Sequence, residues 1–156
     1  MKLFIYTDGA ARGNPGPSAS GYLILDKDKK TVAKFSFYNG ERTNNSAEYL
    51  AIIAALKKAH GEYGNGAEIE LYSDSELVVN QLNMNYKVRE RKLKVLYEEA
   101  SGLAKKFAAC VFINVPRENV QISAVDRELN KLLDSIKKDE NDIAMIRKAG
   151  RQEGLF

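Results

Sequence analysis

Four acidic residues, each at one end of its own predicted element, have the chemistry and the spacing of a cation site. They are Asp8, Glu48, Asp74 and Asp126. Asp8 and Asp74 each follow an apolar, strand-like segment, and the carboxyl ends of neighbouring parallel strands are where α/β sheets place ligands. Glu48 and Asp126 lie near the starts of two predicted helices. If those helices pack on the sheet, all four carboxylates can point to the same place.

Such a cluster needs cations, because four carboxylates crowded together repel one another strongly. Hard oxygen ligands without a histidine or cysteine partner suit Mg²⁺ or Mn²⁺ rather than zinc. Two such ions about 4 Å apart can activate a water molecule and stabilise the leaving oxygen of a phosphodiester. The four acids therefore predict a site for Mg²⁺, for which Mn²⁺ can substitute.

Each acid also has a purely structural interpretation. Asp8 could be a turn residue, since Asp-Gly after a strand is a common turn signal. Glu48 could complete a capping box in which Asn45 is the N-cap. In SDSE, Ser73 and Glu76 could form another capping box, while Asp74 and Asp126 would merely suit the dipoles of their helices. The conjunction of all four acids favours the cation site over these separate explanations.

The surroundings of Asp8 also favour a ligand site. Residues 5–25 read IYTDGAARGNPGPSASGYLIL, in which two strands flank a loop rich in glycine and proline. Backbone opened by Gly9, Gly13 and Gly16 lets a ligand come close to the carboxylate at the end of the first strand.

Nine elements are predicted to position these residues. Strands are expected at 3–8, 19–26, 31–38, 68–73 and 110–115, and helices at 46–60, 74–82, 89–107 and 122–136. The first three strands are joined by short turns and should form an antiparallel meander, whereas the last two return through helices and should lie parallel to the first. We therefore predict an α/β fold with a five-stranded mixed sheet and helices on both faces.

Length and composition fit one globular domain. The chain has 156 residues, 44% of them hydrophobic, and we expect a single domain over residues 1–140 and a tail of mixed charge over 141–156. Cys110 has no partner for a disulfide, no signal peptide is recognisable after Met1, and the apolar runs are too short for a bilayer. We expect a cytoplasmic monomer that does not contact membranes.

The charge balance is compatible with a polyanionic partner. The net charge is +3, so if the four acids hold −4 of it, the rest of the surface carries +7 (3 + 4). A positive field around a small acidic pocket suits a nucleic acid that must approach bound cations. A net charge of +3 is also ordinary for a domain of this size.

Four motifs resemble those of the ribonuclease H type 1 family. They are TDGAARGNPGP, TNNSAEY, LYSDS, and VPREN followed by Asp126 on a helix. The resemblance covers residues 3 to 136 and is greatest to the compact archaeal and bacterial members, which lack a basic protrusion. It implies a ribonuclease H-like fold and an endonuclease that cuts the RNA strand of an RNA–DNA hybrid, leaving 5′-phosphate and 3′-hydroxyl ends.

The resemblance also implies roles for individual residues. Asp8 would bridge both ions, Glu48 and Asp74 would share the ion on the leaving-group side, and Asp126 would help to hold the ion that activates water. The remaining motif positions would contact the substrate: Ala11 and Asn14 the RNA 2′-hydroxyls, Asn44 and Asn45 base edges, and Thr43 a DNA phosphate. Short amides and backbone N–H groups suit the wide, shallow groove of a hybrid, although Asn44 and Asn45 are also common capping residues.

The chain departs from the family pattern in the loop before the last helix. Many members carry a histidine there, where this chain has Arg117, and we expect Arg117 to contact phosphate in its place; the alternative is a solvated arginine. The loop is also slightly longer, which makes Asp134 a distant substitute for Asp126. Basic residues after NMNY, including Lys87 and Arg89, could grip the DNA backbone or form a solvated helix face.

Two other functions fit the same pattern. A non-catalytic module could bind hybrids or structured RNA on the same fold, and a nuclease of this family could also cut double-stranded RNA. The tail ends in Gln152, Leu155 and Phe156, which faintly resembles a clamp-binding peptide. We expect no clamp binding, and a tail that packs on its own domain or lies disordered.

Overall fold

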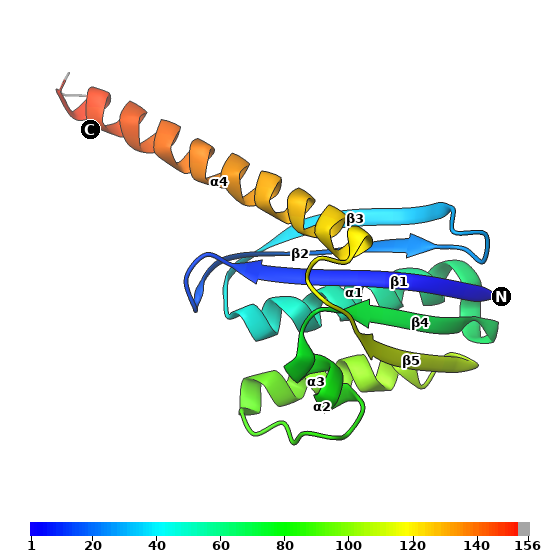
Figure 1. Ribbon diagram of the computed structural model, residues 1–156. Coiled ribbons are helices and arrows are strands. Elements are labelled where there is room, and N and C mark those ends of the chain that lie inside the picture. The colour runs from blue at the N-terminus through cyan, green and yellow to red at the C-terminus, as the bar shows by residue number, and fades with distance from the viewer. Residues whose placement is uncertain (153–156) are drawn as a thin grey trace.

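The computed structural model describes residues 1–152, and the side chains of residues 1–150. The strands are β1 (Lys2–Ala11), β2 (Gly16–Leu25), β3 (Thr31–Arg42), β4 (Glu68–Ser73) and β5 (Ala109–Asn114). The α-helices are α1 (Asn44–Tyr63), α2 (Glu76–Leu82), α3 (Arg91–Ala104) and α4 (Val120–Gln152), and a short 3₁₀ turn, η1 (Gly64–Gly66), follows α1. Figure 1 shows their arrangement.

The strands form one mixed sheet in the order β3-β2-β1-β4-β5. β1 pairs with β2 and β2 with β3 in antiparallel fashion, whereas β4 is parallel to β1 and β5 is parallel to β4. Because β1 is the central strand, Leu3 and Ile5 are fully buried. The predicted topology of a meander followed by two parallel strands is therefore confirmed.

Helices cover both faces of the sheet, as predicted (Figure 1). On one face α1 lies against β1 and β2, and α3 packs on α1. α1 is apolar on nearly every side, which is why it can be buried between the sheet and α3. On the other face α4 packs across β2, β1 and β3, with Val125, Leu129 and Leu133 against Ala19.

A glycine allows α4 to come this close to the sheet. Gly21 of β2 pairs with Asp8 of β1. A Cβ atom at Gly21 would lie 2.9 Å from Leu129 Cδ2 and 3.2 Å from Val125 Cγ1, which is closer than packed carbon atoms normally approach. The missing side chain thus sets the height of α4 above β1, and with it the height of Asp126.

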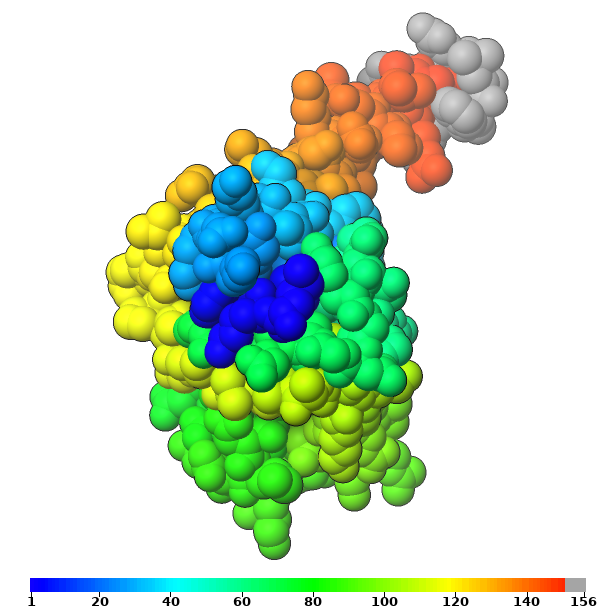
Figure 2. Space-filling model, turned by 90° about the vertical axis from the view of Figure 1, so that its right-hand side faces the viewer, coloured from blue at the N-terminus to red at the C-terminus, as the bar shows by residue number. Residues whose placement is uncertain are grey.

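α4 differs from the prediction in its length. The helix was expected to end near Ile136 but continues to Gln152, so the boundary predicted at 140/141 falls inside it. No proline or glycine interrupts residues 137–149, and Lys, Glu, Ala, Met and Arg are good helix formers. Every residue of 137–149 is exposed, and this part of α4 projects away from the body in Figures 1 and 2. We had expected residues 141–149 to pack on the domain or to lie disordered. Both expectations are wrong, because these residues form an exposed part of α4.

Two further expectations concern the ends and surface of the chain. Leu155 and Phe156, on which the resemblance to clamp-binding peptides rests, lie outside the described residues. Among residues 1–152, no helix combines the length and the hydropathy that a bilayer crossing requires.

Candidate active site

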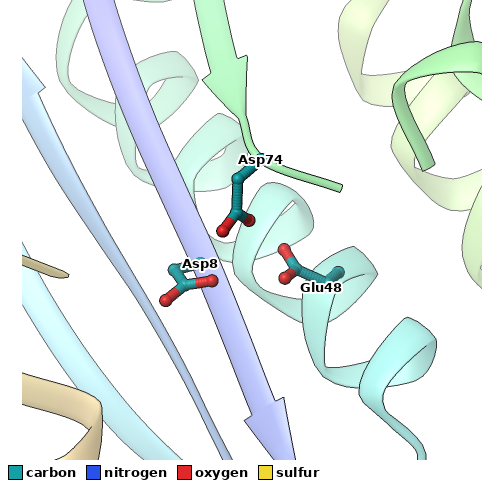
Figure 3. A group of neighbouring side chains, drawn as sticks. All are labelled: Asp8, Glu48 and Asp74. Carbon is teal, nitrogen blue, oxygen red and sulfur yellow. The ribbon is translucent and has the colours of Figure 1, made fainter. Parts of the chain in front are cut away.

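Three carboxylates from three different elements converge at one end of the sheet. Asp8 belongs to β1, Glu48 to the first turns of α1, and Asp74 follows β4. One oxygen from each carboxylate can be chosen so that all three lie within 4.8 Å of one another. Figure 3 shows the three side chains turned toward a common space. The structure thus brings together three of the four acids singled out in the sequence.

The register of the sheet places Asp74 beside Asp8. β1 and β4 run parallel, with Tyr6 paired to Tyr72 at the end of their ladder. Two residues further along, Asp8 and Asp74 stand level, at the point where β4 ends and β1 continues to Ala11. Asp8 therefore lies within a strand and pairs with Gly21, rather than in a turn after it.

Glu48 reaches the site because α1 begins directly against β1. A Cβ atom at Gly9 would lie 2.3 Å from the carbonyl carbon of Ala47 and 2.4 Å from the backbone nitrogen of Glu48, so only glycine permits this approach. The buried Ser20 hydroxyl of β2 donates a hydrogen bond of 2.6 Å to the Ala47 carbonyl. These contacts fix the start of α1 on the sheet and direct Glu48 toward Asp8.

The proposed capping boxes are wrong in both helices. Thr43, not Asn45, is the N-cap of α1, and its hydroxyl accepts a hydrogen bond from the Ser46 N–H. Ser75, rather than Ser73, is the N-cap of α2. The physical reason is that each helix begins at a residue whose side chain reaches the N–H group three positions later. Glu48 therefore has no part in a capping box.

Burial of the acids makes their charged forms costly. Only 5% of Asp8 and 7% of Glu48 are exposed. Burial raises the pKa of Asp8 to about 8, and the neighbouring charges of Asp74 and Asp126 also raise it. Burial and then the charges of Asp8 and Asp74 raise the pKa of Glu48 well above its usual range. Burial also raises the pKa of Asp74, against the opposing effect of Arg117.

The residues present fit a divalent cation. Glu48 Oε2 is a buried oxygen without a hydrogen-bond partner, and an unpaired buried carboxylate oxygen is energetically costly. No basic side chain lowers the pKa of Glu48 or of the neighbouring Asp8. Oxygen-only donors at this spacing suit Mg²⁺ or Mn²⁺. A bound cation would satisfy the oxygen and remove the repulsion together.

An open cleft of about 780 Å³ surrounds the three acids. Asp126 lines it from α4 and is close enough to raise the pKa of Asp8 and Asp74, although it is not one of the three residues whose oxygens lie within 4.8 Å. Asp134 lies outside the lining and instead forms an ion pair with Arg12, at 2.7 Å. Asp134 therefore does not substitute for Asp126.

Arg117 is brought to the cleft, as the sequence suggested. Its side chain is 87% exposed, and its Nε lies 3.9 Å from Asp74 Oδ2. An exposed ion pair at this distance contributes little to stability, which leaves the guanidinium available to an anion in the cleft.

The residues expected to contact substrate hold one another in place. Asn44 and Asn45 line the cleft with Ala11. Asn44 Oδ1 accepts a hydrogen bond of 2.8 Å from the Ala11 N–H, and Asn14 Oδ1 accepts one of 3.1 Å from the Asn44 N–H. These bonds tie the loop after β1 to the start of α1. The side-chain amide nitrogens of Asn44 and Asn45 remain available to a ligand in the cleft.

Two of the expected basic contacts lie elsewhere, and another basic residue was missed. Lys87 and Arg89 are exposed in the link between α2 and α3 and do not line the cleft. Arg12 does line it, and its guanidinium donates to the Asn130 side-chain oxygen at 3.2 Å. The signal in the sequence was an arginine within the glycine-rich loop that follows Asp8.

Comparison with known proteins agrees with this geometry. The reverse transcriptase-like family matches residues 6–125. A bifunctional protein of Mycobacterium tuberculosis is 38% identical over 136 residues, which are 86% of this chain but 36% of that protein. The chain thus spans about a third of the length of the first curated relatives that it matches.

Solved structures match over almost their whole length. The RNase H1 of the halophilic archaeon Halobacterium salinarum is 36% identical, with a TM-score of 0.79, and the match covers 86% of this chain and 99% of that one. LC11-RNase H1, isolated from compost and solved in complex with an RNA/DNA hybrid, is 37% identical with a TM-score of 0.80, over 86% and 98% of the two chains.

Proposed function

The chain belongs to the ribonuclease H type 1 family, and we propose that it is an endonuclease that cuts the RNA strand of RNA–DNA hybrids. One observation carries the proposal: Asp8, Glu48 and Asp74 meet in an open cleft without a basic residue buried among them. A protein that only binds a polyanion gains nothing from such a cluster, because the charges repel phosphate unless cations intervene.

Asp8, Glu48, Asp74 and Asp126 would hold two divalent ions, with Mg²⁺ in that role and Mn²⁺ as a substitute. In this proposal Asp8 would contribute to holding both ions, Glu48 and Asp74 would serve the ion on the leaving-group side, and Asp126 would serve the ion that activates water. The chemistry that divalent ions would supply at these residues is a water molecule of lowered pKa and charge stabilisation for the leaving oxygen of a phosphodiester. The products would carry 5′-phosphate and 3′-hydroxyl ends.

The rest of the cleft supports selection of RNA. The amides of Asn44 and Asn45 and the backbone beside Ala11 line the cleft next to the acids. Such short donors and acceptors can read 2′-hydroxyls and base edges across a shallow groove. The exposed guanidinium of Arg117 can contact a phosphate at the level of Asp74. Ala11 thus stands on β1 with Asp8, and the two asparagines stand on α1 with Glu48.

Cleavage of a labelled RNA–DNA hybrid in Mg²⁺, in Mn²⁺ and in chelator tests the proposal. We expect cleavage of the RNA strand with either ion, none in chelator, and none for Asp74→Asn with either ion. Asp28→Asn is a matched control, because Asp28 is an exposed acid in the turn after β2, and it should cleave normally.

Two outcomes would overturn the proposal in different ways. Cleavage that persists in Asp74→Asn would contradict the role of the acidic cluster. Tight hybrid binding in chelator, without cleavage when Mg²⁺ is added, would instead identify a non-catalytic binding module. Double-stranded RNA offered beside the hybrid shows whether the activity extends to it.

We further propose that Lys87 and Arg89 contact the DNA backbone outside the cleft. Replacing both with glutamine should raise KM and flatten its dependence on salt while leaving kcat unchanged. The reason is that binding of the hybrid releases fewer counterions from the DNA when fewer phosphates are contacted. Lys27→Gln with Lys30→Gln is the control pair, since both are exposed in the turn after β2, at the end of the sheet away from the acids. An unchanged salt dependence for the Lys87/Arg89 variant would rule out this contact.

A further inference from the structure

The second half of α4 forms an exposed arm. We define the arm as residues 137–149, all of which are exposed. It is about 20 Å long at the rise of an α-helix and stands clear of the body in Figures 1 and 2. An isolated helix of this length is only marginally stable in water. A partner that packs against the arm would therefore stabilise its helical structure.

The arm continues the apolar stripe by which α4 packs on the sheet. Ile122, Leu129, Ile136 and Ile143 are spaced seven residues apart, and Ile146 follows three residues after Ile143. Ile122 and Leu129 are fully buried. Ile143 is 49% exposed and Ile146 is 65% exposed. A heptad pattern of this kind is what one helix presents to another, and in the arm it meets no other part of the described chain.

In place of the monomer expected from the sequence, we propose that two copies of this chain pair through their arms, which lie antiparallel across a two-fold axis near Ala144 and Met145. The side of α4 on which the stripe lies decides the orientation. Because Ile143 and Ile146 face the same side of α4 as the residues that meet the sheet, a parallel partner would have to place its own domain where the first domain already lies. An antiparallel partner places its domain at the opposite end of the arm, away from the first domain.

The charges of the arm favour the same arrangement. After Lys137 and Lys138, its first half carries the acids Asp139, Glu140 and Asp142, and its second half carries the bases Arg147 and Lys148. Antiparallel pairing brings the acidic half of each arm opposite the basic half of the other, and the two-fold axis repeats the contact. Parallel pairing would place acid level with acid and base level with base.

One pair of residues is expected to contact across the interface. Glu140 and Arg147 are seven residues apart and therefore flank the stripe on the same side of the helix. In an antiparallel pair, Glu140 of each copy approaches Arg147 of the other. Two short arms bury less area than a standard interface, so the dimer should be reversible and should dissociate on dilution.

Sedimentation equilibrium of the full chain over a wide concentration range tests the proposal. We expect the mass to rise from that of a monomer to that of a dimer, and the double variant Ile143→Asp/Ile146→Asp to remain monomeric throughout. Circular dichroism confirms that this variant folds. A monomeric mass for the unaltered chain at every concentration would overturn the proposal, whatever the result of the cleavage assay.

Charge reversal and crosslinking test the pairing itself. Glu140→Arg alone and Arg147→Glu alone should each weaken the dimer, and a mixture of the two variants should form a heterodimer, because every contact is then between opposite charges. In the variant Lys138→Cys, the new thiol of one copy should not form a disulfide with the new thiol of the other copy. In an antiparallel pair these two thiols lie at opposite ends of the paired arms. A disulfide at that position, or no recovery in the mixture, would contradict the antiparallel arrangement.

Discussion

The acidic cleft and the arm each hold side chains in an unfavourable environment, but the side chains are polar in the cleft and apolar in the arm. In the cleft, carboxyl oxygens are buried, and Glu48 Oε2 has no hydrogen-bond partner among the described residues. In the arm, Ile143 and Ile146 are exposed to water. Each arrangement costs free energy unless something is added, a cation in the first case and an apolar surface in the second.

The two regions differ in how the chain holds them. The cleft is assembled from β1, α1, β4 and α4, and Gly9 and Gly21 allow the helices to approach from opposite faces. The arm is a single helix in which every residue of 137–149 is exposed. Loss of the cation should therefore change the rate of hybrid cleavage and the dependence of stability on pH. Loss of the arm's partner should leave the stability of the rest of the domain unchanged.

The largest expected effect comes from removing the central charge of the cleft. Asp8→Asn should reduce hybrid cleavage by about 10³-fold or more, because cation binding supplies several kcal/mol of transition-state stabilisation. The same variant should unfold at a higher temperature in chelator, since the buried carboxyl and its repulsion are gone. Cleavage rate and Tm are measured on one preparation, and a lower Tm in chelator would contradict the view that the acids repel one another.

A smaller effect is expected where the backbone of the cleft is crowded. Gly9→Ala should lower the free energy of unfolding by about 2–3 kcal/mol, because the new Cβ overlaps the backbone at the start of α1. Gly102→Ala is the matched control. Gly102 lies within α3 with no atom near its Cβ position, so alanine should raise stability by up to about 1 kcal/mol. Denaturant titration compares the two, and an equal effect would show that the approach of α1 to β1 is not tight.

The buried acids should make stability depend on pH in an unusual direction. The folded pKa of Asp8 is about 8, above its ordinary value of 3.8, so between these values the folded chain holds a proton that the unfolded chain releases. Stability is then greatest at the acidic end of this window and falls as pH rises toward 8, by up to about 1.4 kcal/mol per pH unit for each such group. Mg²⁺ should raise Tm more at pH 8 than at pH 5, because a cation favours the charged form.

Thermal melts at several pH values, with and without Mg²⁺, measure this dependence. Asp8→Asn is the informative comparison, since it should show a flatter pH profile in chelator and a smaller rise in Tm on adding Mg²⁺. A rise in stability between pH 5 and pH 8 in chelator would contradict the raised pKa of the cluster.

The sheet and the three central acids could be predicted because each rests on a local pattern joined to a general rule. Short turns between the first strands and helical connections before the later ones determine which strands run parallel. Parallel β1 and β4 in turn bring Asp8 and Asp74 to the same level. No knowledge of side-chain packing is needed for that step, which is why it succeeds from sequence alone.

Other features depend on three-dimensional distances that no spacing encodes. The capping residues were each assigned two positions away from the observed Thr43 and Ser75, because several neighbouring residues can cap. The ion pair of Arg12 with Asp134 joins residues far apart in the chain. The end of α4 was placed too early because Asp139 and Glu140 interrupt the apolar stripe, and an interruption looks the same as a helix end when no glycine or proline marks it.

The smallest expected effect distinguishes the two halves of α4 directly. Leu129 and Ile143 occupy equivalent positions of the same stripe, but Leu129 is fully buried and Ile143 is 49% exposed. Leu129→Ala should cost about 2–5 kcal/mol, because it leaves a cavity against the sheet, whereas Ile143→Ala should change stability by no more than about 0.5 kcal/mol in dilute solution. Denaturant titration at low and high protein concentration measures both. If the arms pair, Ile143→Ala should become more destabilising as the concentration rises while the cost of Leu129→Ala stays constant; a large effect of Ile143→Ala at the lowest concentration would mean that the arm packs on its own domain.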